Sequence, residues 1–221
     1  MAIEAIIFDF GGVIILGSPR SDDPSSPMAV LERDHSLPAG FLWPAVYLDN
    51  PGWQRLRVGD GSYEEWDLLS REAIAEVSNQ ATAIAVVAAL NASRPQGPGL
   101  AGKPAVFNDG MIALIGRLRL KYRVGLLSNA APGLEEELRT HYRIYDLFHD
   151  VINSATVRLA KPDPRIYQLA AQRIGSPITS CFFTDDLAHN IEAARVTGMT
   201  AHEFTGYAGL ELALKQAGVV T

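Results

Sequence analysis

The stretch that decides the fold lies near the start of the chain and reads Ile3-Glu4-Ala5-Ile6-Ile7-Phe8-Asp9-Phe10-Gly11-Gly12-Val13. A β-rich apolar run ends there in a carboxylate, Asp9, which a glycine pair soon follows. In open α/β sheets, ligands bind at the carboxyl ends of the strands. A charge at such a place is unfavourable unless a metal, a hydrogen bond or a counter-ion meets it. Asp9 is therefore either a functional carboxylate or an Asp in a solvent-exposed turn, and the rest of the chain decides between the two.

Composition narrows the class of protein. The 221 residues suffice for one α/β domain with a small insertion. A formal net charge of −6 with scattered cations argues against nucleic-acid binding. Cys181 is the only cysteine, which excludes an intrachain disulfide and fits a reducing compartment. Because the sequence has no long apolar span and lacks the basic start of a secretion signal, we predict a cytoplasmic protein without a membrane partner.

The part of the chain after the first strand is typical of helices. Residues 17–27 are rich in Ser, Asp and Pro and predict a loop. Residues 28–90 predict helices without a strand. The clearest helix is Tyr63 to Val77, where Ser62 can cap the start and apolar residues recur at helical spacing. Residues 91–104 are dense in Gly and Pro and predict a linker.

The second half of the chain alternates between short strands and helices. The predicted strands are 124–127, 151–152, 181–183 and 200–204, and the predicted helices are 111–120, 134–142, 163–174, 191–197 and 210–217. Such alternation indicates a parallel sheet covered on both faces. We therefore predict an α/β core formed by residues 1–17 and 105–221, with a helical insertion at 18–104.

Polar residues stand at the ends of three of these strands. Asp9, Asp185 and Asp186 would share a small volume if their strands are parallel and adjacent. Two unit charges roughly 4 Å apart repel by about 4 kcal/mol at an effective dielectric near 20, so such a cluster needs a cation. An all-oxygen site favours Mg²⁺. Ser128 and Asn129 add neutral donors suited to phosphoryl oxygens.

Lys161 stands just before Pro162-Asp163-Pro164, at the junction of a loop and a helix. A lysine there can neutralise an anion near the strand ends. Taken alone, a Lys-Pro pair is more typical of an ordinary surface lysine.

Together these segments resemble the haloacid dehalogenase superfamily of aspartate-nucleophile hydrolases over nearly the whole chain. The matching segments are residues 6–13, residues 125–129, Lys161-Pro162-Asp163-Pro164-Arg165-Ile166-Tyr167 and residues 183–195. The resemblance implies a Rossmann-like core with an inserted helical cap over the active site. Its Asp9-Phe10-Gly11-Gly12-Val13 variant resembles a phosphatase-like branch near glucose-1-phosphate phosphatases and the N-terminal domains of epoxide hydrolases.

The resemblance also implies catalytic roles. Asp9 would attack phosphorus and carry an aspartyl-phosphate, which splits one hard step into two. Ser128 and Asn129 would bind the transferring phosphoryl group. Lys161 would stabilise the nucleophile and the anionic transition state.

A magnesium site is implied as well. Asp9, Asp185 and Asp186 would hold Mg²⁺ together with the backbone carbonyl of Gly11. Asn190 follows Asp186 by one helical turn and would orient the acidic pair.

One position departs from the usual phosphatase pattern. A second Asp normally follows the nucleophile by two residues and serves as general acid and base, but Gly11 occupies that position here. A positioned acid–base group is typically worth about 10²–10⁴ in rate. Asp60 is a candidate replacement from the inserted segment, although turn formation is its simplest role.

Three functions are compatible with these residues. The first is a magnesium-dependent phosphatase acting on a small-molecule phosphate ester. The second is a 2-haloacid dehalogenase, which tolerates Gly11 but works without metal, so that Asp185 and Asp186 argue against it. The third is a catalytically impaired binding or regulatory protein with the same fold. The oligomeric state stays open, with a homodimer among the alternatives.

Overall fold

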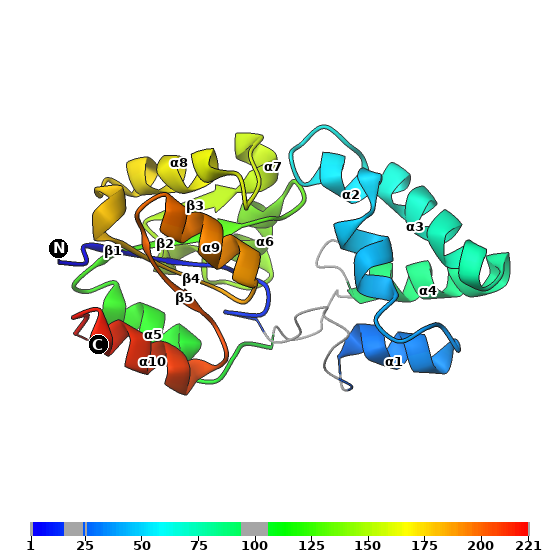
Figure 1. Cartoon of the computed structure of the whole chain (residues 1–221), viewed down its shortest axis with the longest axis horizontal. Helices are drawn as coiled ribbons and strands as arrows, with labels where there is room; N and C mark the ends of the chain where they lie inside the picture. The colour runs from blue at the N-terminus through cyan, green and yellow to red at the C-terminus, as the bar shows by residue number, and fades with distance from the viewer. Residues whose placement is uncertain (1, 16–23, 25, 94–105, 221) are drawn as a thin grey trace. The chain divides into compact units, whose positions relative to one another are not determined.

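The computed structural model describes residues 2–15, 24, 26–93 and 106–220. The chain divides into two compact units, one formed by Met1–Leu16 with Ala105–Thr221 and the other by Gly17–Pro104. The first unit contains all the described strands and the second is helical (Figure 1). The chain thus leaves the α/β unit after its first strand and returns to it before the second.

A parallel sheet forms the centre of the α/β unit. Its strands are β1 (Ala5–Phe8), β2 (Arg123–Ser128), β3 (Asp150–Asn153), β4 (Cys181–Asp185) and β5 (Thr200–Glu203), in the order β3-β2-β1-β4-β5. Every neighbouring pair is parallel. Phe8 lies in register with Leu126 of β2 and Thr184 of β4. The residues that follow the three central strands therefore meet at one edge, and the predicted α/β fold with a Rossmann-like parallel sheet is confirmed.

Helices cover both faces of this sheet (Figure 1). They are α5 (Met111–Leu118), α6 (Leu134–Thr140), α7 (Ser154–Val157), α8 (Pro164–Ile174), α9 (Ala188–Val196) and α10 (Tyr207–Gln216), with 3₁₀ turns η2 (Tyr145–Leu147) and η3 (Ile178–Ser180). Side chains alternate along a strand, so Ile6 and Phe8 pack with α5, α6 and α10, whereas Ala5 and Ile7 pack with α8 and α9. The sequence did not predict α7, and it placed the start of α9 three residues too late because the cap Leu187 carries no capping side chain.

Gly125 allows α8 to lie close to β2. A Cβ added at Gly125 would stand 2.1 Å from the Cδ1 atom of Ile174, so a larger residue would force the Ile174 side chain to move. The close approach matters for the site because α8 begins just after Lys161, and its position helps to fix the loop that carries this lysine.

The second unit consists of helices packed around aromatic residues. Its elements are α1 (Pro27–Asp34), the π-helix η1 (Pro44–Leu48), α2 (Pro51–Leu56), α3 (Tyr63–Val77) and α4 (Gln80–Ser93). Tyr47, Trp53 and Trp66 form its aromatic centre, with ring centroids 4.7–5.3 Å apart. Helix α4 continues to Ser93, so the start predicted for the linker is wrong by three residues. Residues 94–104 of that linker and most of the predicted 17–27 loop lie outside the described residues.

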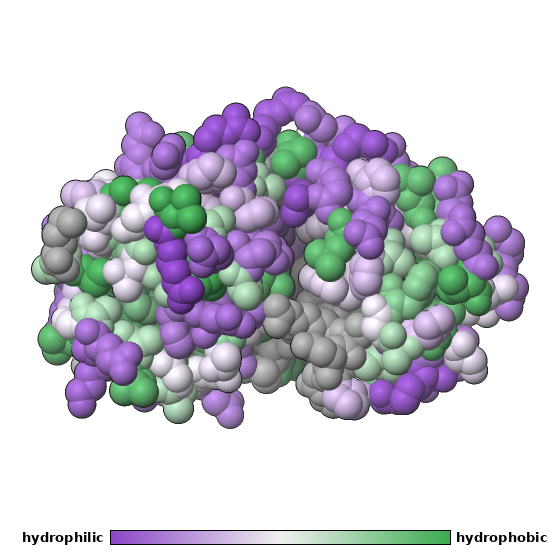
Figure 2. Space-filling view, in the orientation of Figure 1, coloured by the Kyte–Doolittle hydropathy of each residue, from purple (hydrophilic) through white to green (hydrophobic). Residues whose placement is uncertain are grey.

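Part of the surface of this unit is apolar. Leu68 and Val77 of α3 and Ile84 of α4 are each about half exposed. Figure 2 shows hydrophobic residues on the viewed face of this unit, mixed with hydrophilic ones, as on the α/β unit. The apolar part is explained by α4, which carries small and apolar residues around most of its circumference.

Buried polar side chains of the helical unit bind nearby backbone. The carboxylate of Glu32, which is 2 % exposed, accepts hydrogen bonds from the N–H groups of Gly40 and Leu42, both at 2.8 Å. The amide of Asn50 donates to the carbonyl of Ala45 at 3.1 Å and accepts from the N–H of Gly52 at 2.9 Å. These side chains supply hydrogen-bond partners to backbone N–H and carbonyl groups in the turns that join the short helices.

Hydrogen bonds join the two segments of the α/β unit that flank the insertion. Ile15 and Phe107 form an antiparallel bridge. Asn108 donates its side-chain N–H to the carbonyl of Val13 at 2.7 Å, and its backbone N–H to that of Ile14 at 2.9 Å. The outgoing and returning segments therefore lie side by side.

Candidate active site

Asp9 follows the central strand and is 7 % exposed. Its backbone N–H donates to the carbonyl of Thr184 at 2.9 Å, so the residue stays attached to the neighbouring strand β4. The chain then turns tightly, because the carbonyl of Phe10 accepts from the N–H of Ile14 at 2.9 Å and Gly12 has φ +78°, a value that favours glycine. The carboxylate is therefore held at the carboxyl edge of the sheet, and the solvent-exposed alternative for Asp9 is wrong.

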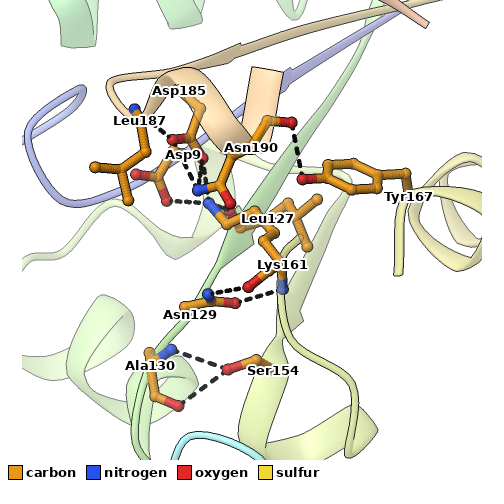
Figure 3. A network of polar contacts seen from close by, with 10 residues as sticks. All are labelled: Asp9, Leu127, Asn129, Ala130, Ser154, Lys161, Tyr167, Asp185, Leu187 and Asn190. Carbon is orange, nitrogen blue, oxygen red and sulfur yellow. Dashed lines mark hydrogen bonds and ion pairs between the residues drawn. The ribbon is translucent and has the colours of Figure 1, made fainter. Parts of the chain in front are cut away.

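Lys161 joins two of the carboxylates (Figure 3). Its Nζ atom lies 2.7 Å from Oδ1 of Asp9, 2.6 Å from Oδ2 of Asp185 and 3.0 Å from the carbonyl oxygen of Leu127. The residue is 2 % exposed, so the surface-lysine alternative is wrong as well. Burial alone lowers the pKa of the Lys161 ammonium, but the charges of Asp185 and Asp9 outweigh burial and raise that pKa above its ordinary value.

Asp185 is fully buried and hydrogen-bonded on every side. Its Oδ1 atom accepts from the N–H of Leu187 at 2.8 Å, and the Nδ2 atom of Asn190 lies 3.0 and 3.1 Å from its two oxygens. The hydroxyl of Tyr167 donates to the carbonyl of Asn190 at 2.9 Å (Figure 3). The structure thus brings Asn190 against Asp185, supported by a tyrosine for which sequence reasoning gave no role.

Asp9, Asp185 and Asp186 can share a cation. Each offers a carboxylate oxygen, and these oxygens lie within 4.8 Å of one another. An ion about 2.1 Å from each oxygen needs them within roughly 4.2 Å of one another, so binding would draw the carboxylates slightly together. With the ammonium of Lys161 included, three carboxylates leave a net charge of about −2, which a divalent ion balances. The donors are all hard oxygens, so the residues present fit Mg²⁺.

The electrostatic surroundings of Asp9 favour a cation beside its carboxyl group. Burial raises the pKa of the Asp9 carboxyl to about 7; Lys161 opposes this rise, and the negative charges of Asp185 and Asp186 add to it. A carboxylate in such surroundings is not fully ionised at neutral pH without a further cation. A divalent ion beside Asp9 would favour the ionised form of its carboxyl group.

Ser128 and Asn129, the two predicted phosphoryl ligands, differ in their surroundings. Ser128 ends β2, is 5 % exposed and lies in register with Asn153 of β3. The side chain of Asn129 is hydrogen-bonded to the backbone of Lys161, since its Nδ2 donates to the Lys161 carbonyl and its Oδ1 accepts from the Lys161 N–H, both at 2.8 Å. The structure therefore brings both residues to the site, but it gives Asn129 a protein partner that the sequence did not predict.

Ser154 holds the segment after β2 through a second set of hydrogen bonds. The hydroxyl of Ser154 accepts from the N–H of Ala130 at 3.0 Å and lies 3.3 Å from its carbonyl oxygen (Figure 3). No motif in the sequence pointed to Ser154, because the pairing joins residues 24 positions apart.

At Gly11 there is no side chain in the position where the usual phosphatase pattern has its second Asp. A Cβ added at Gly11 would meet nothing within 4 Å, so the backbone leaves room for a larger residue. The candidate replacement Asp60 is exposed, and its backbone N–H donates to the carbonyl of Arg55 at 3.0 Å, as expected for a turn residue.

The chain matches the model of the haloacid dehalogenase-like hydrolases over residues 3–198 and belongs to that family. It is 37 % identical over 97 residues to "Phosphatase MT3486" of Mycobacterium tuberculosis, covering 43 % of this chain and 45 % of that protein. It is 36 % identical over 78 residues to the fructose-1-phosphate phosphatase YqaB of Escherichia coli, covering 35 % and 40 %. The chain thus matches less than half of the length of these relatives.

Solved structures share the fold. One is a HAD family enzyme from Bacteroides thetaiotaomicron in complex with magnesium and inorganic phosphate, with a TM-score of 0.61 and 19 % identity over 93 % of this chain and 96 % of that one. Another is an L-2-haloacid dehalogenase from Xanthobacter autotrophicus, with a TM-score of 0.57 and 17 % identity over 99 % and 85 %. At these identities the similarity shows the fold alone.

Within the residues that the structure describes, none of the helices combines the length and the apolar character needed to cross a membrane.

Proposed function

We propose that this hydrolase is a magnesium-dependent phosphatase that acts on a small phosphorylated metabolite through an aspartyl-phosphate on Asp9. The observation that carries the proposal is the pairing of Lys161 with both Asp9 and Asp185 beside the third carboxylate, Asp186. A nucleophile, a fixed cation and a divalent-metal site then stand at one edge of the sheet. The names of the two curated relatives support the same reaction class.

The reaction takes place in two displacements at phosphorus. The carboxylate of Asp9 forms a bond to phosphorus while the bond to the leaving alcohol oxygen breaks, and water then attacks the aspartyl-phosphate to release inorganic phosphate and restore Asp9. Lys161 orients Asp9 and opposes the protonation that burial favours, and the hydroxyl of Ser128 donates to a phosphoryl oxygen. When bound to Asp9, Asp185, Asp186 and the carbonyl of Gly11, Mg²⁺ would neutralise charge on the phosphoryl group.

The leaving oxygen must receive a proton from a group other than residue 11. Water can supply it, at a lower rate than a positioned acid would. Substrates whose leaving oxygen is already weakly basic need this proton least. The proposal therefore favours acyl, hemiacetal or phenolic phosphates over simple alkyl phosphates.

The dehalogenase alternative also requires Asp9 and tolerates Gly11. The acidic pair Asp185 and Asp186 beside Asp9 argues against it, because two further negative charges there suit a metal and a metal-free reaction does not need them. The third alternative, a catalytically impaired binding protein, keeps Gly11 as its only support. The ion-paired Asp9 argues against it.

Phosphate release from p-nitrophenyl phosphate and a panel of sugar phosphates tests the proposal, with Mg²⁺ and with a chelator. We expect turnover that needs Mg²⁺ and is absent in Asp9→Asn. Halide release from 2-chloropropionate without metal would instead establish the dehalogenase. Magnesium binding without turnover on any substrate would favour the binding protein.

A further inference from the structure

We propose that Asn129 is a positioning residue for Lys161, and that its side chain influences the reaction through this lysine instead of binding the phosphoryl group. The inference rests on the proposed function for its kinetic consequence. The geometry behind it consists of contacts within the protein alone.

The side-chain amide of Asn129 is paired with the backbone of one residue. It donates to the carbonyl of Lys161 and accepts from the N–H of the same residue, both at 2.8 Å (Figure 3). The two residues are 32 positions apart, so this contact joins the end of β2 to the loop before α8. A rotation of the amide toward another ligand would break both hydrogen bonds.

Lys161 is also held at the other end of its side chain. Its Nζ atom donates to the carbonyl of Leu127 at 3.0 Å. Leu127 and Asn129 flank Ser128, so the terminus of β2 holds the lysine by its backbone and by its ammonium. The side chain between these two points has little freedom to shift.

This restraint matters because the ammonium must reach two carboxylates at once. Its hydrogen bonds of 2.7 Å to Asp9 and 2.6 Å to Asp185 leave little slack, and Lys161 is almost completely buried. A displacement of its backbone by about 1 Å would lengthen one of the two bonds, and misplacement on this scale can lower a rate by roughly 10²-fold.

Ser154 offers a matched control, because it contacts Ala130, the residue that follows Asn129. Ser154 forms two contacts with the backbone of Ala130, just as Asn129 does with Lys161. Ser154→Ala therefore removes two contacts from the backbone of Ala130 and leaves the contacts of Lys161 in place.

The kinetic test is a double-mutant cycle with Lys161→Met, which removes the ammonium and keeps the apolar stem. We expect Asn129→Ala to lower kcat about 10- to 100-fold, with KM and the inhibition constant of inorganic phosphate within about threefold of wild type. In the Lys161→Met background, Asn129→Ala should have less than about a twofold effect, whereas the effect of Ser154→Ala should multiply with that of Lys161→Met. Equal effects of Asn129→Ala in both backgrounds, together with much weaker phosphate inhibition, would overturn the proposal and assign Asn129 to the phosphoryl group.

A second measurement does not depend on activity. Amide hydrogen exchange by NMR, on the protein without substrate, reports the hydrogen bond of the Lys161 N–H directly. We expect exchange at Lys161 to accelerate at least tenfold in Asn129→Ala and to stay unchanged in Ser154→Ala. Unchanged protection in Asn129→Ala would refute the positioning role. Absence of turnover in the wild-type enzyme would refute only the proposed function.

Discussion

The two units of this protein bury polar side chains in different ways. In the α/β unit, Asp9, Lys161 and Asp185 bind one another across sequence separations of 152 and 24 residues. In the helical unit, Glu32 is buried to the same degree, but it binds the backbone of a turn eight to ten residues away. Burial of a charge therefore does not by itself indicate chemistry.

The partners make the difference. A carboxylate that accepts two backbone N–H groups replaces hydrogen bonds that water would have made, and it stabilises the fold locally. A carboxylate brought beside other carboxylates is destabilising unless a cation joins it, and here the ammonium of Lys161 joins two of the three. Substitutions in the two units should accordingly affect different properties.

The largest effect is expected at Asp9. Asp9→Asn should lower turnover on the order of 10⁴-fold or more, because an amide cannot form the aspartyl-phosphate. Its melting temperature should stay within a few degrees of wild type, since the substitution preserves volume and removes one charge from a crowded acidic cluster. Steady-state kinetics and thermal unfolding measure both. Wild-type turnover in this variant would remove Asp9 from the mechanism.

The acidic cluster should respond to magnesium. Saturation at about 100 times Kd should stabilise the protein by about 2.7 kcal/mol and raise its melting temperature, and Asp186→Asn should lose most of this rise. Glu192→Gln is the control, because Glu192 is an exposed carboxylate on α9 outside the cluster. Calorimetry with and without chelator makes the measurement. An equal response to Mg²⁺ in wild type and Asp186→Asn would place the ion elsewhere.

Gly11 offers a gain of function. Gly11→Asp should raise kcat about tenfold or more on alkyl phosphates, because the backbone leaves room for the side chain and a carboxyl group can then protonate the leaving oxygen. Gly11→Asn has nearly the same shape without an ionisable proton. Similar rates in the two variants would show that the missing acid does not limit turnover.

Glu32 should affect stability alone. Glu32→Ala leaves the N–H groups of Gly40 and Leu42 without their acceptor and should lower the free energy of unfolding by about 2 kcal/mol or more. Glu76→Ala, an exposed glutamate in the same unit, should change it by less than about 0.5 kcal/mol. The Mg²⁺-induced rise in melting temperature should be unchanged in both. A loss of that rise in Glu32→Ala would contradict the division between the units.

The smallest effect is expected at His202 on β5. Burial first, and then the positive charge of Arg195, lower the pKa of this imidazole, while Glu203 opposes the shift. The unfolded chain therefore binds a proton more readily than the folded one, and stability should decrease as pH falls below about 6.5. His202→Gln should show a shallower decrease in melting temperature across this pH range. Identical pH profiles would exclude His202 as a contributor.

Much of the fold could be predicted because it depends on local patterns. Tyr63–Val77 is helical over the predicted residues, and the Oγ atom of Ser62 caps it by accepting from the N–H of Glu65 at 3.2 Å. The strand ends that carry Asp9, Ser128 and Asp185 follow from runs of apolar residues. The strand order β3-β2-β1-β4-β5 could not be predicted, because pairing between strands depends on contacts over long sequence distances.

The site was predictable in its residue types but less so in its contacts. A carboxylate after a strand and a lysine before a helix are visible in the sequence, and they meet as expected. That Asn129 holds the Lys161 backbone could not be predicted, since an amide at a strand end is equally suited to a phosphoryl oxygen and to a peptide group. Tyr167 was quoted as part of a motif, but its bond to Asn190 depends on the docking of α8 against α9.

The bridge between Ile15 and Phe107 has a consequence for how such proteins diversify. Residues paired in an antiparallel bridge have Cα atoms about 5 Å apart. The chain therefore leaves the α/β unit and returns to it at two closely spaced points. A segment with such closely spaced ends can be exchanged, lengthened or removed while the sheet keeps its register. The α/β unit can thus accept different inserted segments between Leu16 and Ala105. Changes in the inserted unit can then leave in place the sheet edge that carries Asp9 and Asp185.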